Sequence, residues 1–466
     1  MDQTYWTRLL AAEYTSRKFL IVSESLAGAS NLVRFLGECG AQRPFIIAAN
    51  EGMGELPDPA DAEWAMLATN GSTHMAFIRS FLEAVVDLPP RVEAQIDAWD
   101  PDGLAEVLDG FLSAESLVAG RPHYGTRPRA WLDLEDKTVI DEVWDRSEVR
   151  RAPTAVVPVA GPEIDQVAER LDEGAGTVWV GDNTDGWHGG AEYVRWVRSP
   201  DDVFDARNWF TTRCERVRIM PFLEGIPCSV HGFVFPDYVA AIRPIEMLVL
   251  RRPGTTELKY VGTSSFWDPP QRHRKEMRDI ARRVGRVLRA GYAYAGGFTV
   301  DGVATSDGFL PTELNPRMGA GVVRAARGLP DLALAAINRA LIAGVDIDYR
   351  PGEFERVLVT GADSVRSGIG FLMVDAEPDD RQELRVVLSA GRSRLARPGE
   401  KPEATVSWDR GSPSGSVAVR PDPDRVPAGS SIAPWVVRGF EVADRVWDLG
   451  LPEFTAAEDV YAQGGS

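Results

Sequence analysis

The chain has 466 residues, enough for roughly three or four domains, and its 44% hydrophobic and 26% charged residues are typical of a folded globular protein. Acidic residues number 69 and basic residues 51, so the formal charge is −18, which repels nucleic-acid phosphates and anionic lipids. Neither nucleic acid nor a membrane is therefore expected as a partner. Because the sequence has no apolar run of about 20 residues and no basic leader before one, we expect a cytoplasmic protein.

The first 128 residues predict a parallel α/β domain. Residues 17–22 and 45–49 are apolar enough to be buried strands, and a serine-rich loop and a helical pattern stand between them. Helices are also expected at 74–86 and 101–117. Prolines then interrupt the pattern, and we place the end of the domain at residue 128.

Residues 129–227 predict a small lobe rich in strands. A helix is expected from Trp131 toward Trp144. Strands at 177–181 and 192–197 enclose a loop that is rich in glycine and aspartate.

Residues 228–349 predict a larger lobe that begins with an antiparallel sheet and contains a helix from about 274 to 289. Residues 350–466 are rich in proline, glycine and aspartate and predict a β-rich C-terminal domain. Short strands are expected there at 357–359, 370–374, 384–388 and 417–419.

The most informative segment, 296–321, predicts two strands joined by a turn. Asp301 lies on the first strand, and alternation along the second places Glu313, Asn315 and Arg317 on one face. Two carboxylates and an amide oxygen are ligands that Mg²⁺ prefers, and an arginine beside them suits phosphate. A hairpin with a solvated polar face would show the same pattern, so the hairpin by itself leaves both interpretations open.

The stretch from Glu313 to Arg317, ELNPR, with Asp301 twelve positions before Glu313, resembles the metal and phosphate motif of the ATP-grasp superfamily. Members of this superfamily join a carboxylate to an amine through an acyl phosphate made from ATP. The resemblance implies an α/β grasp fold, with a parallel N-terminal domain, a two-lobed core and here a β-rich extension. It implies ATP and Mg²⁺ as cofactors, Asp301, Glu313 and Asn315 as metal ligands, and Arg317 as a catalytic residue.

Further motifs follow the order that the superfamily shows. Asp136-Lys137 resembles a pair whose lysine contacts nucleotide phosphates. The segment 184–191 resembles the glycine-rich flap that closes over the phosphates, through the backbone of Gly186, Gly189 and Gly190.

Two more motifs lie beyond the flap. One resembles the segment that links the two lobes and contacts adenine, here Met220, Pro221, Phe222, Leu223 and Glu224. The other, Lys259-Tyr260, is expected on a loop and resembles a pair near the terminal phosphates, which implies a catalytic role for Lys259.

Three residues are candidates for binding the substrate. Arg243 is suited to a carboxylate or phosphate, with an exposed ion pair to Glu246 as the alternative. Gly319 and Gly321 precede a predicted helix, where their N–H groups suit an oxyanion or form a simple turn. The serines of segment 23–30 stand at a helix start and either bind a carboxylate or cap the helix.

We therefore expect a ligase that forms an amide or peptide bond from a small-molecule carboxylate and an amine, with release of ADP and phosphate. A narrower resemblance is to the pheganomycin-type peptide ligases of natural-product pathways. The superfamily's adenine lysine is missing near Val180-Gly181, and Pro227 stands where an acid usually holds the ribose. These departures keep open a non-catalytic or regulatory nucleotide-binding protein, and an ATP-dependent kinase or ester-forming enzyme. A homodimer is also left open.

Overall fold

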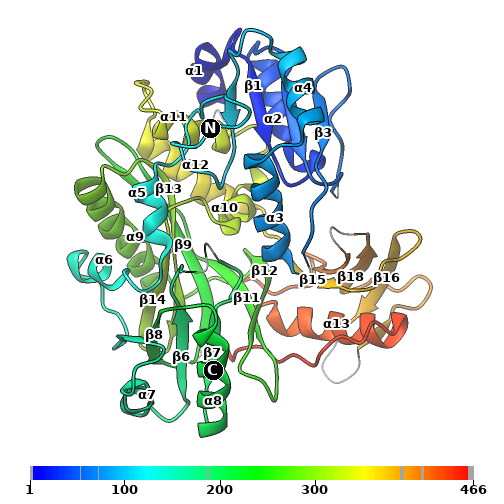
Figure 1. Cartoon of the computed structure of the whole chain (residues 1–466). Helices are drawn as coiled ribbons and strands as arrows, with labels where there is room; N and C mark the ends of the chain where they lie inside the picture. Colours follow the sequence, from blue (N-terminus) through cyan, green and yellow to red (C-terminus); the bar gives the residue numbers. More distant parts are fainter. Residues whose placement is uncertain are drawn as a thin grey trace.

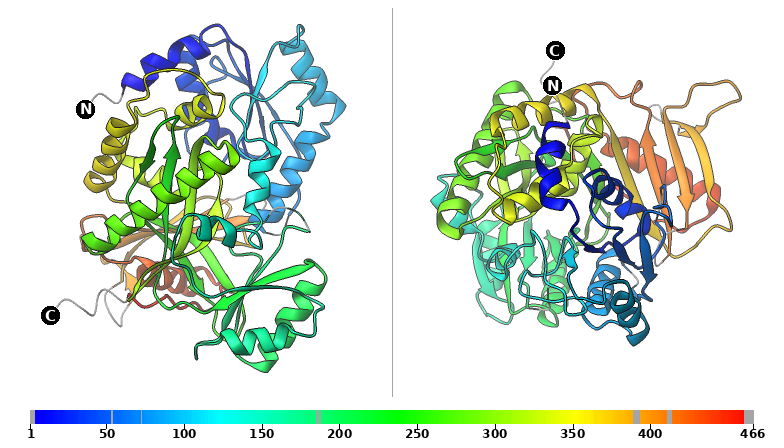
Figure 2. Two further views of the ribbon diagram at one scale, coloured as in Figure 1. Left: turned by 90° about the vertical axis from the view of Figure 1, so that its left-hand side faces the viewer. Right: turned by 90° about the horizontal axis from the view of Figure 1, so that it is seen from above.

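Three β-sheets organise the chain, each built from a different part of the sequence (Figure 1). The computed structural model describes residues 4–459 except 53, 72, 185, 187, 389–392 and 411–413. A four-stranded parallel sheet and a four-stranded antiparallel sheet lie toward opposite ends of the molecule, and an 11-stranded sheet lies between them (Figures 1 and 2). The expected α/β class, with a parallel N-terminal sheet and a large antiparallel sheet, is confirmed.

The N-terminal sheet has the strand order β3-β2-β1-β4 and is parallel throughout. Its central strands are apolar because both faces are covered: Phe19 and Ile21 pack with α1 and α2, and Leu20 packs with α3 and α4. The elements are α1 (Thr4–Tyr14), β1 (Phe19–Val22), α2 (Leu26–Glu38), β2 (Phe45–Ala48), β3 (Glu63–Met66), α3 (His74–Val86), α4 (Pro90–Trp99) and β4 (Glu106–Leu108).

The helix expected at 101–117 is wrong. Gly103, which has a positive φ of 64°, and Gly110 flank a stretch of only three strand residues, which pairs with β1 as strand β4. A helix would have left this apolar stretch without the partner that the parallel sheet provides.

Helix α1 packs against residues of the large lobe and so connects the N-terminal sheet to it. Trp6 Nε1 donates a hydrogen bond of 2.7 Å to the carbonyl oxygen of Tyr349, and its ring lies edge-on to Phe354 with centroids 5.8 Å apart. Phe354 also packs against Phe233 of the large sheet. A shared apolar core therefore fixes the position of the N-terminal domain on the large sheet.

The small antiparallel sheet has the strand order β5-β8-β6-β7. The expected helix from Trp131 to Trp144 is broken in two, because Asp136 Oδ1 accepts hydrogen bonds from the backbone and the hydroxyl of Thr138 and so competes with the helix. The elements are α5 (Arg129–Leu132), η1 (Asp133–Glu135), α6 (Asp141–Arg146), β5 (Ala155–Pro158), α7 (Ile164–Leu171), β6 (Thr177–Gly181), β7 (Val194–Val197), α8 (Pro200–Thr211) and β8 (Arg216–Pro221).

The large sheet runs in the order β14-β13-β9-β11-β12-β15-β19-β18-β16-β17, and β10 pairs with β9. Its first half packs on α9, whose buried residues include Met277, Ile280 and Val284. The elements are β9 (Ile226–Val234), β10 (Val239–Ala241), β11 (Ile245–Arg251), β12 (Leu258–Ser264), α9 (Gln271–Tyr292), β13 (Gly296–Thr305), β14 (Gly308–Asn315), α10 (Ala320–Ala325), η2 (Ala326–Gly328) and α11 (Leu334–Ile342).

The C-terminal strands continue the large sheet, because β15 pairs with β12. The strand expected at 357–359 is wrong: Pro351 begins a helix, and Phe354, Val357 and Leu358 are buried at helical spacing. The elements are α12 (Pro351–Ser364), β15 (Gly368–Val374), β16 (Gln382–Val387), β17 (Arg394–Leu395), β18 (Ala404–Asp409), β19 (Gly415–Pro421) and α13 (Ala433–Trp447). The domain ends proposed at 128, 227 and 349 stay predictions, and residue 227 lies inside β9.

The joint between β12 and β15 depends on Gly262. Its φ is 145°, and a Cβ atom there would lie 2.1 Å from the carbonyl oxygen of Ile369. We therefore expect Gly262→Ala to lower the free energy of unfolding by about 2 kcal/mol or more, measured by urea denaturation. The control is Gly37→Ala on exposed α2 surface, where a Cβ meets nothing within 4 Å and stability should not fall. Equal stability of the Gly262 variant and the wild type would contradict this account.

Candidate active site

Two neighbouring strands of the large sheet bring two carboxylates together. In the hairpin of β13 and β14, Asp301 stands directly opposite Glu313, and the register then shifts at Gly302, which faces Pro311. Residues directly opposite each other in an antiparallel pair project to the same face. The pairing that the sequence predicted for Asp301 and Glu313 is thus present in the geometry.

Asp301 is held from both sides. Ser229 of β9 donates a hydrogen bond to Asp301 Oδ1, and Asn315 Nδ2 donates to Oδ2 at 2.8 Å. Burial and the neighbouring charge of Glu313 raise the pKa of Asp301 to about 7. A carboxyl group that is half protonated at neutral pH beside an ionised one is suited to a divalent cation, which would take the place of the proton.

Lys137 compensates the charge of Glu313. Its Nζ lies 2.7 Å from Glu313 Oε1, and only 3% of Lys137 is exposed. Burial by itself would raise the pKa of Glu313, but the attraction of Lys137 outweighs it and holds the pKa below its usual range. Glu313 is therefore ionised, and the proton of the carboxylate pair resides on Asp301.

A second cation stands just after β14. Arg317 Nε lies 3.4 Å from Glu135 Oε1, and its Nη2 donates to Asn315 Oδ1 at 3.4 Å. Glu135 also pairs with Arg127 at 2.6 Å, and although burial opposes it, the charges of Arg317 and Arg127 lower the pKa of Glu135 to about 2. Glu135 thus orients Arg317, while 25% of the Arg317 side chain stays exposed.

The flap between β6 and β7 reaches this group of charges. His188 is buried, its Nε2 lies 3.1 Å from the Asp182 carbonyl oxygen, and its ring stacks on Tyr193 with centroids 4.2 Å apart. Burial and the positive charge of Lys137 lower the pKa of His188, so its imidazole is neutral. Asp185 and Trp187 of the expected flap lie outside the described residues.

The flap's glycines differ in their surroundings. Gly186 and Gly190 have positive φ angles of 93° and 62°, and a Cβ atom at either would meet nothing within 4 Å. Gly189 is half-buried between them. Their conformation, rather than crowding, is what requires glycine at 186 and 190.

One face of the small sheet points away from α7 and α8 and carries apolar side chains together with the buried Arg218. Met220 packs with Val178 and Val180 on that face, whereas the helices cover the alternate residues of the same strands. Pro221 is the last residue of β8 and stands opposite Thr177. Val178, Val180 and Met220 form a buried apolar patch next to the segment 220–224.

The rest of the linker is tied to neighbouring strands. Phe222 stacks on Trp196 of β7, with ring centroids 4.1 Å apart, and Leu223 is half-buried. Glu224 is exposed and forms an ion pair with Arg251 of β11. The acidic side chain of the linker is thus partly neutralised within the chain.

No lysine stands at the end of β6, but an arginine faces that position from the next strand. Arg218 of β8 pairs in register with Val180, and 1% of it is exposed. Its guanidinium donates to Asp141 Oδ1 at 2.7 and 3.0 Å and to the Thr312 carbonyl oxygen at 3.3 Å. Arg218 therefore joins the small sheet to the hairpin that carries the carboxylates.

Solved structures match the chain along most of its length, although no protein-family model and no curated protein matches it. A biotin carboxylase from Campylobacter jejuni is 13% identical with a TM-score of 0.52, and the match covers 88% of each chain. The biotin carboxylase domain of the 2-oxoglutarate carboxylase from Hydrogenobacter thermophilus is 13% identical with a TM-score of 0.51, over 95% of this chain and 91% of that one. The carboxyaminoimidazole ribonucleotide synthase from Aspergillus clavatus is 12% identical with a TM-score of 0.50, over 92% and 100%.

The chain has the ATP-grasp fold. At 12 to 13% identity these likenesses show the fold alone. Among the described residues, no helix is long and apolar enough to cross a bilayer. The described part of the chain also contains no cluster of three or more histidine, cysteine, aspartate or glutamate side chains placed for a metal, so the candidate set is two carboxylates and an amide.

Five predicted residues meet in the ATP-grasp core, namely Lys137, Asp301, Glu313, Asn315 and Arg317. Lys259 does not join them. It lies on strand β12 rather than on the expected loop and is exposed, whereas Tyr260 faces the other side, where the charge of Asp301 contributes to a raised pKa of its hydroxyl. Alternation along a strand separates the two neighbours.

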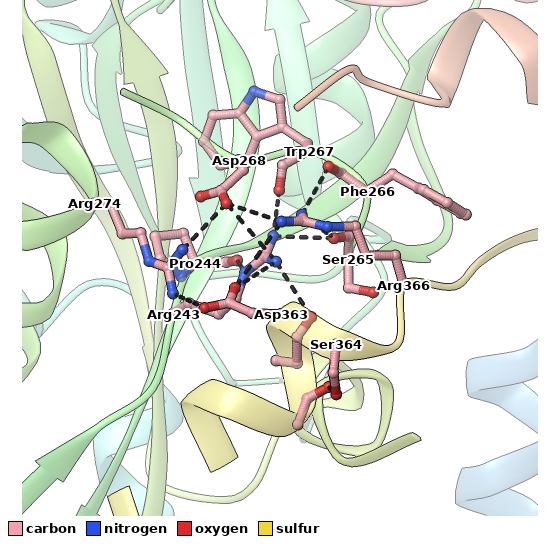
Figure 3. Close-up of polar contacts among 12 residues, drawn as sticks. Arg243, Pro244, Ser265, Phe266, Trp267, Asp268, Arg274, Asp363, Ser364 and Arg366 are labelled. Atoms are coloured by element: carbon pink, nitrogen blue, oxygen red, sulfur yellow. Dashed lines mark hydrogen bonds and ion pairs between the residues drawn. The ribbon is translucent and has the colours of Figure 1, made fainter. Parts of the chain in front are cut away.

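Arg243 lies in a separate buried network (Figure 3). Burial lowers the pKa of its guanidinium to about 10. Its N–H groups donate to the carbonyl oxygens of Pro244, Ala362, Ser265 and Trp267 and to the carboxylate of Asp363. These hydrogen bonds use all five N–H donors of the guanidinium. Arg243 therefore connects α12 with the residues that follow β12.

Gly319 and Gly321 follow the hairpin of β13 and β14 and pack closely over β9. A Cβ atom on Gly321 would lie 2.3 Å from His231 Nε2, and one on Gly319 would lie 2.8 Å from Thr299 Oγ1. The N–H of Gly319 already donates to Thr299 at 3.0 Å. Close packing explains both glycines, and their contact with substrate stays a prediction.

Sequence reasoning missed three residues of the site. Ser229 holds Asp301, Glu135 orients Arg317, and Arg218 joins the two sheets. Glu135 carries a local signal, since it directly precedes Asp136-Lys137. Ser229 and Arg218 carry none: pairing of β9 with β13 creates the contact of Ser229 across 72 residues, and the approach of two different sheets creates that of Arg218 across 94.

The raised pKa of Asp301 predicts a dependence of stability on pH. The pKa of Asp301 is about 7 in the folded chain, whereas an aspartate in the unfolded chain has a pKa near 4. Between these values the folded chain holds a proton that the unfolded chain has released, so the free energy of unfolding falls as the pH rises from about 4 to about 7. Without Mg²⁺, we expect urea unfolding at pH 8 to show a gain of about 1–2 kcal/mol for Asp301→Asn over the wild type, and little gain at pH 4. Asp307→Asn in the exposed turn of the same hairpin is the control, and an equal gain for it would contradict the assignment.

Proposed function

We propose that the protein is an ATP-dependent ligase that joins a carboxylate to an amine and releases ADP and phosphate. The convergence of Lys137, Asp301, Glu313, Asn315 and Arg317 carries this proposal. These side chains come from segments that are far apart in sequence, and burying so many charges is costly unless a ligand uses them. Such an arrangement in an ATP-grasp fold supports chemistry on nucleotide phosphates.

ATP is the proposed nucleotide because structures with this fold are complexes with ATP or with MgADP. The apolar face formed by Val178, Val180 and Met220 would take the adenine ring, beside the linker. The backbone of Gly186, Gly189 and Gly190 would cover the phosphates. In this position the flap excludes water, which matters because water hydrolyses an activated carboxylate.

Asp301, Glu313 and Asn315 would hold Mg²⁺, which supplies neutralising charge to phosphate oxygens. The chain's own cations act next to it. Lys137 is buried and held toward Glu313, and Arg317 is oriented by Glu135 with part of its guanidinium exposed. Both would stabilise negative charge that develops during transfer of the terminal phosphate to the substrate carboxylate.

The carboxylate and amine that this ligase joins are proposed only as a class. The proposed route is an acyl phosphate that the amine then attacks, as in peptide ligases of specialised metabolism, including the pheganomycin type. Support for a peptide-like product comes from the first domain, whose cavity is described below. The competing proposal is a protein that binds the nucleotide without catalysis. Substitution of Glu313 distinguishes it from the ligase.

Glu313→Gln tests the proposed function. We expect the wild type to bind MgADP in a calorimetric titration, and the variant to bind it roughly tenfold or more weakly, because the neutral amide no longer attracts the cation. The variant should also lose release of ADP in a screen of carboxylate and amine pairs. Asp307→Asn, an equal change of charge in the same hairpin, should match the wild type in both assays.

Two results would contradict the ligase. No binding of MgADP to the wild type would remove the nucleotide site altogether. MgADP binding without ADP release for any pair, and with no effect of Glu313→Gln, would favour the non-catalytic nucleotide-binding protein.

A further inference from the structure

The N-terminal domain contains a cavity of about 320 Å³ that the roles proposed above do not use. It lies at the carboxyl ends of β1 and β4, between Val22 and Asp109. The chain passes from β1 to β2 and β3 on one side, whereas β4 lies on the other, so this is the point where the strand order changes direction. Open parallel sheets bind ligands at such points.

Glu24 lines this cavity and has no partner for its carboxylate among the described residues. Its backbone carbonyl accepts hydrogen bonds from the N–H of Ala49 at 3.2 Å and from Asn50 Nδ2 at 3.0 Å, which fixes the residue in place. Burial raises the pKa of the Glu24 carboxyl. A half-buried carboxylate on a backbone that is held in place, with no cation beside it among the described residues, is suited to a positively charged ligand.

The other acid in the cavity wall, Asp109, already has partners within the chain. Asp109 Oδ2 lies 2.6 Å from His123 Nδ1, and its Oδ1 accepts the N–H groups of Phe111 and Leu112 at 2.8 and 2.7 Å. The residues that line the cavity include no lysine or arginine. Glu24 is therefore the acid in this cavity whose carboxylate has no partner among the described residues.

The start of α2 borders the cavity, yet it has no N–H group to offer an anion. The N–H of Leu26 donates to the carbonyl of Asn50, that of Ala27 to the carbonyl of Glu51, and that of Gly28 to Ser25 Oγ. Ser25 therefore caps the helix, and the hydroxyls of Ser23 and Ser30 donate to the carbonyl oxygens of Ser25 and Glu55, which favours the cap over the carboxylate site that the sequence left open. Phe81 and Phe111 supply aromatic wall, which also favours a cation.

A second cavity of about 180 Å³ adjoins the first. The two share Asp109, Gly110 and Phe111, and the second is also lined by Arg127 and Arg317. The charge thus changes from negative at one end to positive at the end next to the carboxylate pair. A ligand that spans both cavities needs an ammonium group at one end and an anionic group at the other.

We propose that the N-terminal cavity binds the ammonium group of the substrate whose carboxylate reaches Arg317, so that this substrate is an amino acid or a short peptide. This inference rests on the proposed ligase function for the second end. The amine that attacks must be unprotonated, so the ammonium group held at Glu24 belongs to the substrate that is activated. The attacking amine enters elsewhere.

The test uses two probes of the same shape and opposite charge on the full chain without nucleotide. Phenethylammonium and 3-phenylpropionate are titrated by ligand-observed NMR. We expect the wild type to prefer the cation, and Glu24→Gln to weaken cation binding about tenfold, because a charge-assisted contact is lost. Glu38→Gln, at the exposed far end of α2, should leave the affinity unchanged. Glu24→Asp should retain part of the preference, and its circular dichroism should match the wild type.

The outcomes separate this inference from the proposed function. A preference for 3-phenylpropionate, no binding of the cation to the wild type, or equal affinities of wild type and Glu24→Gln would overturn it. Cation preference together with a failed MgADP titration would remove the ligase and leave the ammonium site. MgADP binding without cation preference would remove the ammonium site and leave the ligase proposal standing.

Discussion

The ion pair between Lys137 and Glu313 is the contact on which the candidate site depends. It links the turn after η1 to β14 and allows one of two facing carboxylates to remain ionised. With the proton on Asp301, three cations, Lys137, Arg127 and Arg317, stand against the ionised Glu135 and Glu313. These groups together therefore carry a small net positive charge inside a chain whose formal charge is −18.

The hairpin was predictable because its chemistry is local. Alternation along a strand is enough to put Asp301 and Glu313 on one face, and a short turn is enough to pair them. Lys137 was found through the order of motifs rather than through any physical signal of its own. The fold classes of the first domain and the large lobe could be predicted from runs of apolar residues. Such runs are needed because both faces of a covered sheet are buried.

The predictions that differ from the structure concern residues whose secondary structure or contacts depend on partners distant in the sequence. Residues 357–359 are apolar in either a strand or a helix, and the pattern from Phe354 onward decides for the helix only once α12 has a sheet to cover. Lys259 was assigned to a loop, whereas it lies on β12, which pairs with β11 at Lys259 and with β15 at Gly262 to Ser264. Arg243 has an ordinary sequence context, and only the fold shows that its donors are consumed.

The pairing of β12 with β15 makes the C-terminal strands inseparable from the core. Ending the chain after residue 350 would leave Gly262 to Ser264 of β12 without their partner strand at an open sheet edge and uncover the apolar side chains of Leu248, Leu250 and Val261. Such an edge is a template for pairing with other chains. A chain that ended at residue 350 would therefore be prone to aggregation, and the candidate site is best studied in the full chain.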